Sequence, residues 1–438
     1  METLIYTINT FFLGLLNIII KGNAFLNGEI VENVSIIVND EGVIVGVVKG
    51  TSKLKATYDF TGNRQLILPG MIDIHVHMRD FEESYKEDFY TGTLAAAAGG
   101  VTVICDMPNT KPPTNSFERL MLRDKVASEK AIVDYGLYVG IPSTMEETDQ
   151  LKRIAVGVKV YPKDFKSENL RKFLAKISSN KNFLTIFHAE DADLIKDNIR
   201  PLEAEISGVK KALDYVSKYN VKAHITHVTN HIVVDYVKSS AHKVTVDTCP
   251  HYLLLSVDSV GDSRYFRVDP PLRSEDLRRK LFNYLREGKI DAIVTDHAPH
   301  TLEEKLGENP SPGFPGLETA LPILLTLAIE KQIGLGDVVK LYSENPAKII
   351  GLHKYVGSLG LGKYANLVVV KLNEEYVIDP EKFFSKAKHS PFKGFKVKGK
   401  VVATFVRGKP VFINGEVVGK KGYGINIKRY GERTCWIS

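Results

Sequence analysis

Two histidines separated by a single residue, His75 and His77, directly follow an apolar segment at residues 66–72. The segment has the composition of a buried strand. Side chains two positions apart on a strand point to the same face, so the two imidazoles can bind one metal ion. The pair alone is equally typical of histidines that bind nothing. A metal site therefore requires further ligands elsewhere in the chain.

Short β-branched segments, separated by helix-like stretches, must position these residues. Eight strands are expected, at residues 66–77, 101–107, 131–139, 157–161, 183–188, 222–228, 243–248 and 290–296. Amphipathic or alanine-rich helices are expected between them, including residues 91–99, 116–130, 168–178, 201–218 and 274–288. Alternating strands and helices indicate parallel βαβ units, and eight of them predict an α/β fold, the (β/α)8 TIM barrel. A doubly wound sheet is the alternative.

The two ends of the chain have a different pattern, with alternating β segments punctuated by glycine. They span residues 15–65 and about 356–438. Neither end is large enough to form a stable sheet domain alone. We therefore expect one small composite β-sandwich built from both ends, a catalytic barrel at residues 66–355, and an N-terminal extension at residues 1–14.

Polar side chains gather at the predicted C-terminal ends of the barrel strands, where chemistry takes place in this fold. These ends carry six side chains that can bind a metal: His75, His77, Lys159, His188, His227 and Asp296. Burial by chance would scatter such groups along the strands. Their shared position favours a functional site over a structural role.

Imidazole and carboxylate ligands suit Zn²⁺ or a similar divalent ion. A catalytic site with one metal takes about three protein ligands, so the larger set predicts two metals about 3.5–4 Å apart. An ammonium group on Lys159 would be strongly repelled by two dications. Lys159 is therefore displaced, neutral or converted to a carbamate that bridges the ions, and a salt-bridging lysine is the structural alternative.

Three further residues can complement a negatively charged substrate. Arg79 can bind a carboxylate bidentately, Asn109 offers an amide, and His300 follows the last metal candidate by four residues. For Asn109, a turn-forming role beside prolines is an equal alternative.

The other histidines are expected to be structural or ordinary. His224 lies three residues before His227, so alternation points it to the opposite face. His251 closes the seventh strand and packs there. The remaining ones are expected to be ordinary surface or helix residues: His231, His242, His353 and His389.

The composition is that of a soluble globular protein, with 44% hydrophobic and 25% charged residues. The net charge of +6 does not indicate a nucleic-acid-binding protein. The basic tail from Lys382 onward is interpreted as a solvated face. The uncharged segment 4–20 is shorter than the ~20 residues that a membrane span needs. Three scattered cysteines fit a reducing compartment, so we expect a cytoplasmic protein with no membrane partner.

Together these motifs resemble the cyclic amidohydrolases, and most closely the dihydroorotases. The similarity extends over about residues 66–350. The motifs that carry it lie at residues 70–79, 86–89, 98–102, 107–110, 295–305 and 313–319. The last two are similar in particular to the dihydroorotase domain of the animal multifunctional pyrimidine-synthesis protein.

The resemblance implies a reaction and a role for each residue. The reaction is the reversible cyclisation of N-carbamoyl-L-aspartate to L-dihydroorotate in de novo pyrimidine synthesis. His75, His77 and Asp296 would hold one zinc, and His188 and His227 the second. Carboxylated Lys159 and a hydroxide would bridge the two ions, and Asp296 would transfer the proton. The group that would bind the substrate carboxylate is Arg79, Asn109 and His300.

Two departures from the family pattern concern the substrate. Asp269 stands where many relatives have asparagine, and an acid there would repel an anion. Asp80 and Phe81 replace the usual Pro-Gly after Arg79, which leaves the shape of that loop open.

Other functions and partners stay open at this point. Hydantoinases, dihydropyrimidinases and allantoinases share the fold but mostly act on uncharged rings, and Arg79 argues against them. An inactive scaffold homologue would have lost metal ligands, whereas all six positions are filled here. A homo-oligomer or an association with aspartate carbamoyltransferase fits the habits of the family.

Overall fold

The structure is a computed structural model and describes residues 18–50, 54–62, 64–178, 182–261 and 263–431. The predicted N-terminal extension lies outside the described residues, as does Cys435. The other two cysteines, Cys105 and Cys249, are buried and free, as expected for core residues. Among the described helices, none combines the length and the apolar character that crossing a membrane requires.

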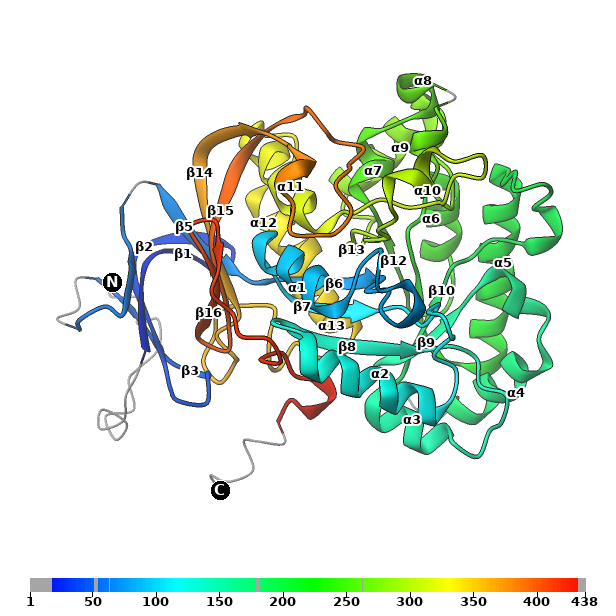
Figure 1. Cartoon of the computed structure of the whole chain (residues 1–438), viewed down its shortest axis with the longest axis horizontal. Helices are drawn as coiled ribbons and strands as arrows, with labels where there is room; N and C mark the ends of the chain where they lie inside the picture. The colour runs from blue at the N-terminus through cyan, green and yellow to red at the C-terminus, as the bar shows by residue number, and fades with distance from the viewer. Residues whose placement is uncertain (1–17, 51–53, 63, 179–181, 262, 432–438) are drawn as a thin grey trace.

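Within the described residues, eight parallel strands form a nearly closed barrel (Figure 1). They are β6 (Met71–Val76), β7 (Val101–Asp106), β8 (Asp134–Val139), β9 (Gly157–Val160), β10 (Leu184–Phe187), β11 (Lys222–Ile225), β12 (Val244–Thr248) and β13 (Ala292–Ile293). A parallel bridge between Val76 and His297 links the first strand to the segment that follows the last. The predicted TIM barrel is thus confirmed over the doubly wound sheet.

Helices cover the outside of the barrel. The longer ones are α1 (Phe89–Ala98), α2 (Phe117–Lys130), α3 (Thr148–Ile154), α4 (Glu168–Ile177), α5 (Leu202–Tyr219), α6 (His231–Lys238), α9 (Glu275–Arg286) and α11 (Leu317–Ile329). The shorter helices are α7 (Pro250–Leu254), α8 (Val257–Val260), α10 (Leu302–Leu306), α12 (Leu335–Val339) and α13 (Asn345–Ile349). The five helices expected from the sequence each form within two residues of the predicted bounds.

Both ends of the chain meet in a second, mixed sheet, which counts nine strands among the described residues (Figure 1). They are β1 (Ile18–Leu26), β2 (Glu29–Val38), β3 (Ile44–Lys49), β4 (Tyr58–Phe60), β5 (Gln65–Pro69), β14 (Leu367–Val377), β15 (Lys396–Val406), β16 (Lys409–Ile413) and β17 (Glu416–Val417). β5 joins the two ends because it pairs with β1 on one side and with β14 on the other. Residues from both ends, such as Ile36 and Phe405, share an apolar core that is separate from the barrel core.

The single strand expected at residues 66–77 is wrong, because the chain changes sheets at Gly70. β5 belongs to the mixed sheet and β6 to the barrel. Gly70 packs so closely that a Cβ there would lie 2.4 Å from Thr102 Cγ2. The apolar pattern runs unbroken across both strands, so periodicity could not reveal the change. The last barrel strand is also shorter than predicted, since β13 ends at Ile293, and the backbone is left-handed at Asp296, with φ of 47°.

Candidate metal centre and substrate pocket

A cavity of about 310 Å³ opens at the C-terminal ends of the barrel strands. The structure brings all nine predicted site residues to its wall. Six of them form what we call the metal cluster: His75, His77, Lys159, His188, His227 and Asp296. The other three form what we call the anion-binding group: Arg79, Asn109 and His300.

Three residues of the metal cluster already have the geometry of a metal site. The ligand atoms of His75, His77 and Asp296 all lie within 4.8 Å of one another. Asp296 Oδ1 lies 3.3 Å from His75 Nε2 and 3.1 Å from His77 Nε2. Burial, followed by the charge of Lys159, lowers the pKa of His75 well below its usual value, so the ring is neutral and keeps a lone pair for a cation.

The carboxyl group of Asp296 is the anionic member of this set. Burial acts to raise its pKa, but the hydrogen bond and charge interaction with His77 outweigh burial, and the pKa is lowered overall. A carboxylate beside two imidazoles is a ligand set that Zn²⁺ accepts.

The other three members lie next to this set. The ring of His227 is 4.5 Å from the ring of His188 and 5.0 Å from that of His75, between centroids. His227 Nδ1 and Lys159 Nζ are buried, and neither has a hydrogen-bond partner among the described residues. Burial lowers the pKa of Lys159 to about 7. Buried polar atoms without partners are costly, so this half of the cluster fits an additional ligand such as a second cation.

Three of the four imidazoles are oriented by a hydrogen bond on one ring nitrogen. His75 Nδ1 lies 2.6 Å from Thr226 Oγ1, and His77 Nδ1 lies 2.7 Å from Asn109 Oδ1. His188 Nε2 lies 2.6 Å from Glu190 Oε2. Such contacts fix the ring and leave the opposite nitrogen free for a metal. These contacts were not predicted from the sequence, although the acid two residues after His188 indicates a hydrogen-bond partner for that ring.

The anion-binding group centres on a buried guanidinium. Arg79 is only 7% exposed, and its side chain contacts His300 Nε2 at 3.0 Å and the carbonyl oxygen of Pro299 at 3.2 Å. It forms no ion pair with any described residue. Burial, followed by the charges of Arg79 and Lys86, lowers the pKa of His300 to about 3, so this imidazole is neutral. The side-chain oxygen of Asn109 is the acceptor in the contact with His77 Nδ1, and the amide N–H groups of Asn109 remain as donors.

The loop after Arg79, whose shape the sequence left open, has an unusual backbone. Arg79, Asp80 and Phe81 all have positive φ, at 49°, 62° and 50°. Such conformations cost roughly 1–3 kcal/mol each in residues other than glycine. Arg123 holds the loop by donating to the carbonyl oxygen of Arg79 at 2.7 Å, and Lys130 pairs with the Asp80 carboxylate at 2.8 Å. The surrounding structure thus determines the position of the guanidinium.

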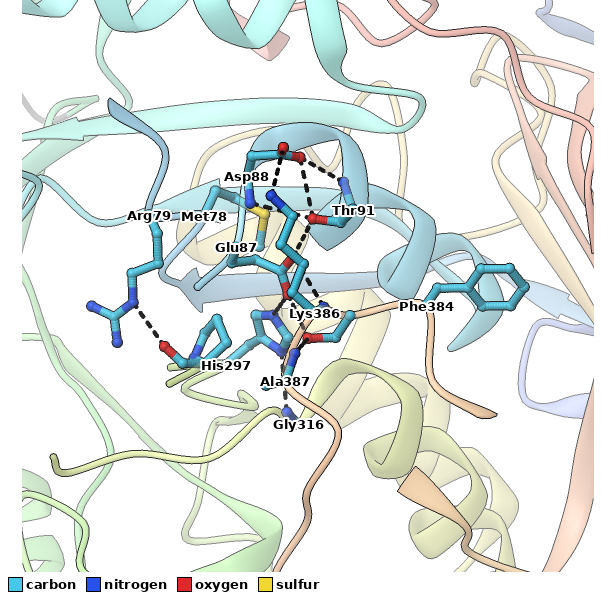
Figure 2. A network of polar contacts seen from close by, with 12 residues as sticks. Met78, Arg79, Glu87, Asp88, Thr91, His297, Gly316, Phe384, Lys386 and Ala387 are labelled. Atoms are coloured by element: carbon cyan, nitrogen blue, oxygen red, sulfur yellow. Dashed lines mark hydrogen bonds and ion pairs between the residues drawn. The ribbon is translucent and has the colours of Figure 1, made fainter. Parts of the chain in front are cut away.

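A segment of the chain that leaves the mixed sheet, residues 383–390 between β14 and β15, packs against these loops (Figure 2). The hydroxyl of Ser385 donates to Glu87, a buried carboxylate that also contacts His297 Nε2 at 3.4 Å. Lys386 Nζ donates to Asp88 at 3.0 Å. His389 was expected to be an ordinary surface or helix residue, but it is buried and its Nε2 donates to the carbonyl oxygen of His300 at 2.9 Å.

Asp269, the acid that departs from the family pattern, lines the cavity but is paired. Its carboxylate lies 3.0 Å from Arg200 Nη2, and Arg200 also pairs with Glu190. A neighbouring guanidinium thus offsets the negative charge that would repel an anionic substrate.

Two further histidines lie outside the cavity wall, as expected for structural residues. His224 is fully buried and its Nε2 lies 2.6 Å from Asp247 Oδ2. His251 is buried with its ring 4.2 Å from that of Tyr252, between centroids.

Comparison with known proteins agrees with this geometry. The amidohydrolase family matches residues 66–411. The dihydroorotase of Pyrobaculum aerophilum is 37% identical over 411 residues, which cover 93% of this chain and 98% of that protein. The dihydroorotase of Pyrococcus abyssi is 36% identical over 413 residues, covering 92% and 97%. Multifunctional protein CAD of Squalus acanthias is 34% identical over 398 residues, which cover 88% of this chain and 16% of that protein.

A solved structure of L-hydantoinase (dihydropyrimidinase) from Arthrobacter aurescens has a similar fold, with a TM-score of 0.84 at 27% identity. The match covers 93% of this chain and 98% of the hydantoinase chain. The similarity in fold is therefore shared with enzymes of other ring specificity, whereas the sequence similarity singles out one activity. The chain belongs to the amidohydrolase family and, within it, to the dihydroorotases.

Proposed function

We propose that the metal cluster binds two divalent cations, with zinc as the expected metal, and that the anion-binding group selects the carboxylate of L-dihydroorotate and N-carbamoyl-L-aspartate. When bound, the cations polarise the amide carbonyl and make a hydroxide available near neutral pH. Side chains of this protein bind the substrate and transfer the proton.

The observation that carries the substrate assignment is the unpaired guanidinium of Arg79. A charge this deeply buried is costly unless an opposite charge meets it. No described acid forms an ion pair with Arg79, and a substrate carboxylate would supply that partner. A neutral hydantoin or dihydrouracil ring would leave the guanidinium unpaired, which disfavours the hydantoinase alternative.

Lys159 and Asp296 have the most demanding roles in the proposal. A neutral lysine can react with carbon dioxide to form a carbamate, and the fully buried Nζ of Lys159 has the lowered pKa that this requires. In the hydrolytic direction, the Asp296 carboxylate accepts the proton of the attacking water and delivers it to the departing ring nitrogen. In ring closure, the same group moves the proton the opposite way.

A competition between substrates tests the proposed specificity. We expect the purified protein, supplied with zinc, to interconvert N-carbamoyl-L-aspartate and L-dihydroorotate with a kcat/KM at least about 100-fold above that for dihydrouracil, hydantoin or allantoin, because only the first pair offers Arg79 a carboxylate. Equal or better activity on the uncharged rings would reject the proposal.

The wider setting is also a proposal. The match to part of the much longer CAD protein supports an association of this chain with other enzymes of pyrimidine synthesis, such as aspartate carbamoyltransferase, in the cytoplasm. Sedimentation of the purified chain alone and with purified aspartate carbamoyltransferase would distinguish a monomer, a homo-oligomer and a mixed complex.

A further inference from the structure

We infer that Asp247 is a positioning residue that sets one ligand in each half of the metal cluster. The first half is His75, His77 and Asp296, and the second is Lys159, His188 and His227. Asp247 acts on His75 through the hydroxyl of Thr226, and on His227 through the backbone. The inference rests on the metal centre in the proposed function, and it adds two residues that do not themselves reach the metal.

Asp247 is a charged residue in the middle of the buried strand β12 and is fully inaccessible to solvent. Its carboxylate accepts hydrogen bonds from His224 Nε2 at 2.6 Å, from Thr226 Oγ1 at 3.1 Å and from the backbone N–H of His227. No lysine or arginine among the described residues pairs with it. A buried carboxylate held by these three donors fixes their positions, because leaving any of its oxygens unpaired would be costly.

The Thr226 hydroxyl links this carboxylate to the metal cluster. A hydroxyl has a single proton, and Thr226 Oγ1 donates it to Asp247. Thr226 must then accept a hydrogen bond from His75 Nδ1, which lies 2.6 Å from Oγ1. This fixes the proton of His75 on Nδ1 and leaves the lone pair on Nε2, the atom that lies 3.3 Å from Asp296. The hydroxyl thus selects the tautomer that can bind a cation.

The second contact of Asp247 with the metal cluster is to the backbone of His227. Its backbone is left-handed, with φ of 47°, a conformation that costs roughly 1–3 kcal/mol in a residue other than glycine. The hydrogen bond from its N–H to Asp247 offsets part of this cost. The turn places the ring 4.5 Å from that of His188 and 5.0 Å from that of His75, between centroids. One carboxylate therefore controls the spacing between the two halves of the cluster.

The alternative is that Asp247 only joins β11 to β12 through His224. Substitutions of two threonines distinguish the positioning role of Asp247 from a purely structural role. Thr226 contacts both Asp247 and His75, whereas Thr245 Oγ1 lies 2.8 Å from His224 Nδ1, on the far side of that histidine. Thr226→Val and Thr245→Val make the same isosteric change, and each removes one hydroxyl from the same network.

The experiment measures zinc affinity by competition with a chelator, together with zinc per chain by mass spectrometry and the melting temperature of the metal-free protein. We expect Thr226→Val to weaken binding of at least one zinc about 10–100-fold, as loss of a partner behind a metal ligand typically does. Thr226→Ser keeps the hydroxyl and should restore the wild-type affinity within about threefold. Thr245→Val should bind zinc like the wild type.

Wild-type zinc affinity in Thr226→Val, or an equal loss in Thr245→Val, would overturn the inference. A loss of zinc matched by a large fall in the melting temperature of metal-free Thr226→Val but not of Thr226→Ser would also overturn it, because the effect would then be structural. Wild-type protein that binds zinc but leaves N-carbamoyl-L-aspartate unchanged would reject the proposed function and leave this inference standing. Wild-type protein that takes up no zinc would reject both.

Discussion

The metal cluster and the anion-binding group share one cavity but are held in different ways. The metal cluster projects from the ends of barrel strands, and its imidazoles are fixed by buried acceptors such as Thr226 and Glu190. The anion-binding group lies on loops, where Arg79 and His300 are held by contacts from Arg123 and from His389 in the 383–390 segment. We therefore propose that strand ends position the metal ligands, and that loops, supported in part by the 383–390 segment, position the groups that recognise the substrate.

This difference implies that the two groups fail differently when they are altered. Changes to the metal cluster or its acceptors should alter metal content and turnover. Changes to Arg79 or its supports should raise KM while the metal content stays constant, whereas Asn109 also contacts the metal-cluster residue His77. Substitutions in each group test whether metal binding and substrate recognition can be altered independently.

Asp296→Asn is expected to reduce kcat by about 10²–10⁴-fold, because an amide cannot accept and return the proton. Binding of L-dihydroorotate, measured by calorimetry, should remain detectable because Arg79 is unchanged. A variant that keeps wild-type turnover would refute the role assigned to Asp296.

Arg79→Met is expected to lower kcat/KM for N-carbamoyl-L-aspartate by about 10–100-fold, the loss of one charged hydrogen-bonding group worth about 1.5–3 kcal/mol. Most of the change should lie in KM, and zinc per chain should equal that of the wild type. Arg279→Met, which alters an exposed arginine on α9 that pairs with Glu275, is the matched control and should leave both quantities unchanged. A loss of zinc in Arg79→Met would show that the two groups are not separable.

Ser385→Ala removes the hydroxyl that joins the 383–390 segment to Glu87. We expect KM to rise about two- to tenfold, in line with the loss of one buried hydrogen bond behind the substrate loop. Ser390→Ala is the control, because among the described residues the Ser390 hydroxyl accepts a hydrogen bond only from the N–H of Phe392, two residues further along the chain. Equal KM values for the two variants would argue against a role of the second sheet in recognition.

Asp269→Asn should have the smallest effect, with KM within about twofold of the wild type, because Arg200 already offsets the charge of Asp269. A tenfold or larger decrease in KM would mean that the carboxylate does repel the substrate despite its partner.

The sequence predicted the barrel and nine of the residues that line the cavity, because strand ends in this fold converge on one edge, so position along the chain translates directly into position in space. It could not reveal the change of sheet at Gly70, where one apolar pattern continues through two strands. Contacts between residues far apart, such as Ser385 with Glu87, leave no local signal. Asp247 was visible as a charge in a buried strand, but its link to His75 depends on the packing of β11 against β12.

We propose that this cavity holds two cations that the reaction requires. Titration of metal-free protein with zinc, with turnover of N-carbamoyl-L-aspartate and bound zinc followed together, tests it most directly. We predict no turnover without metal and an increase in activity that reaches its maximum at two zinc ions per chain. Full activity in metal-free protein, or a maximum at a single bound zinc, would contradict the account.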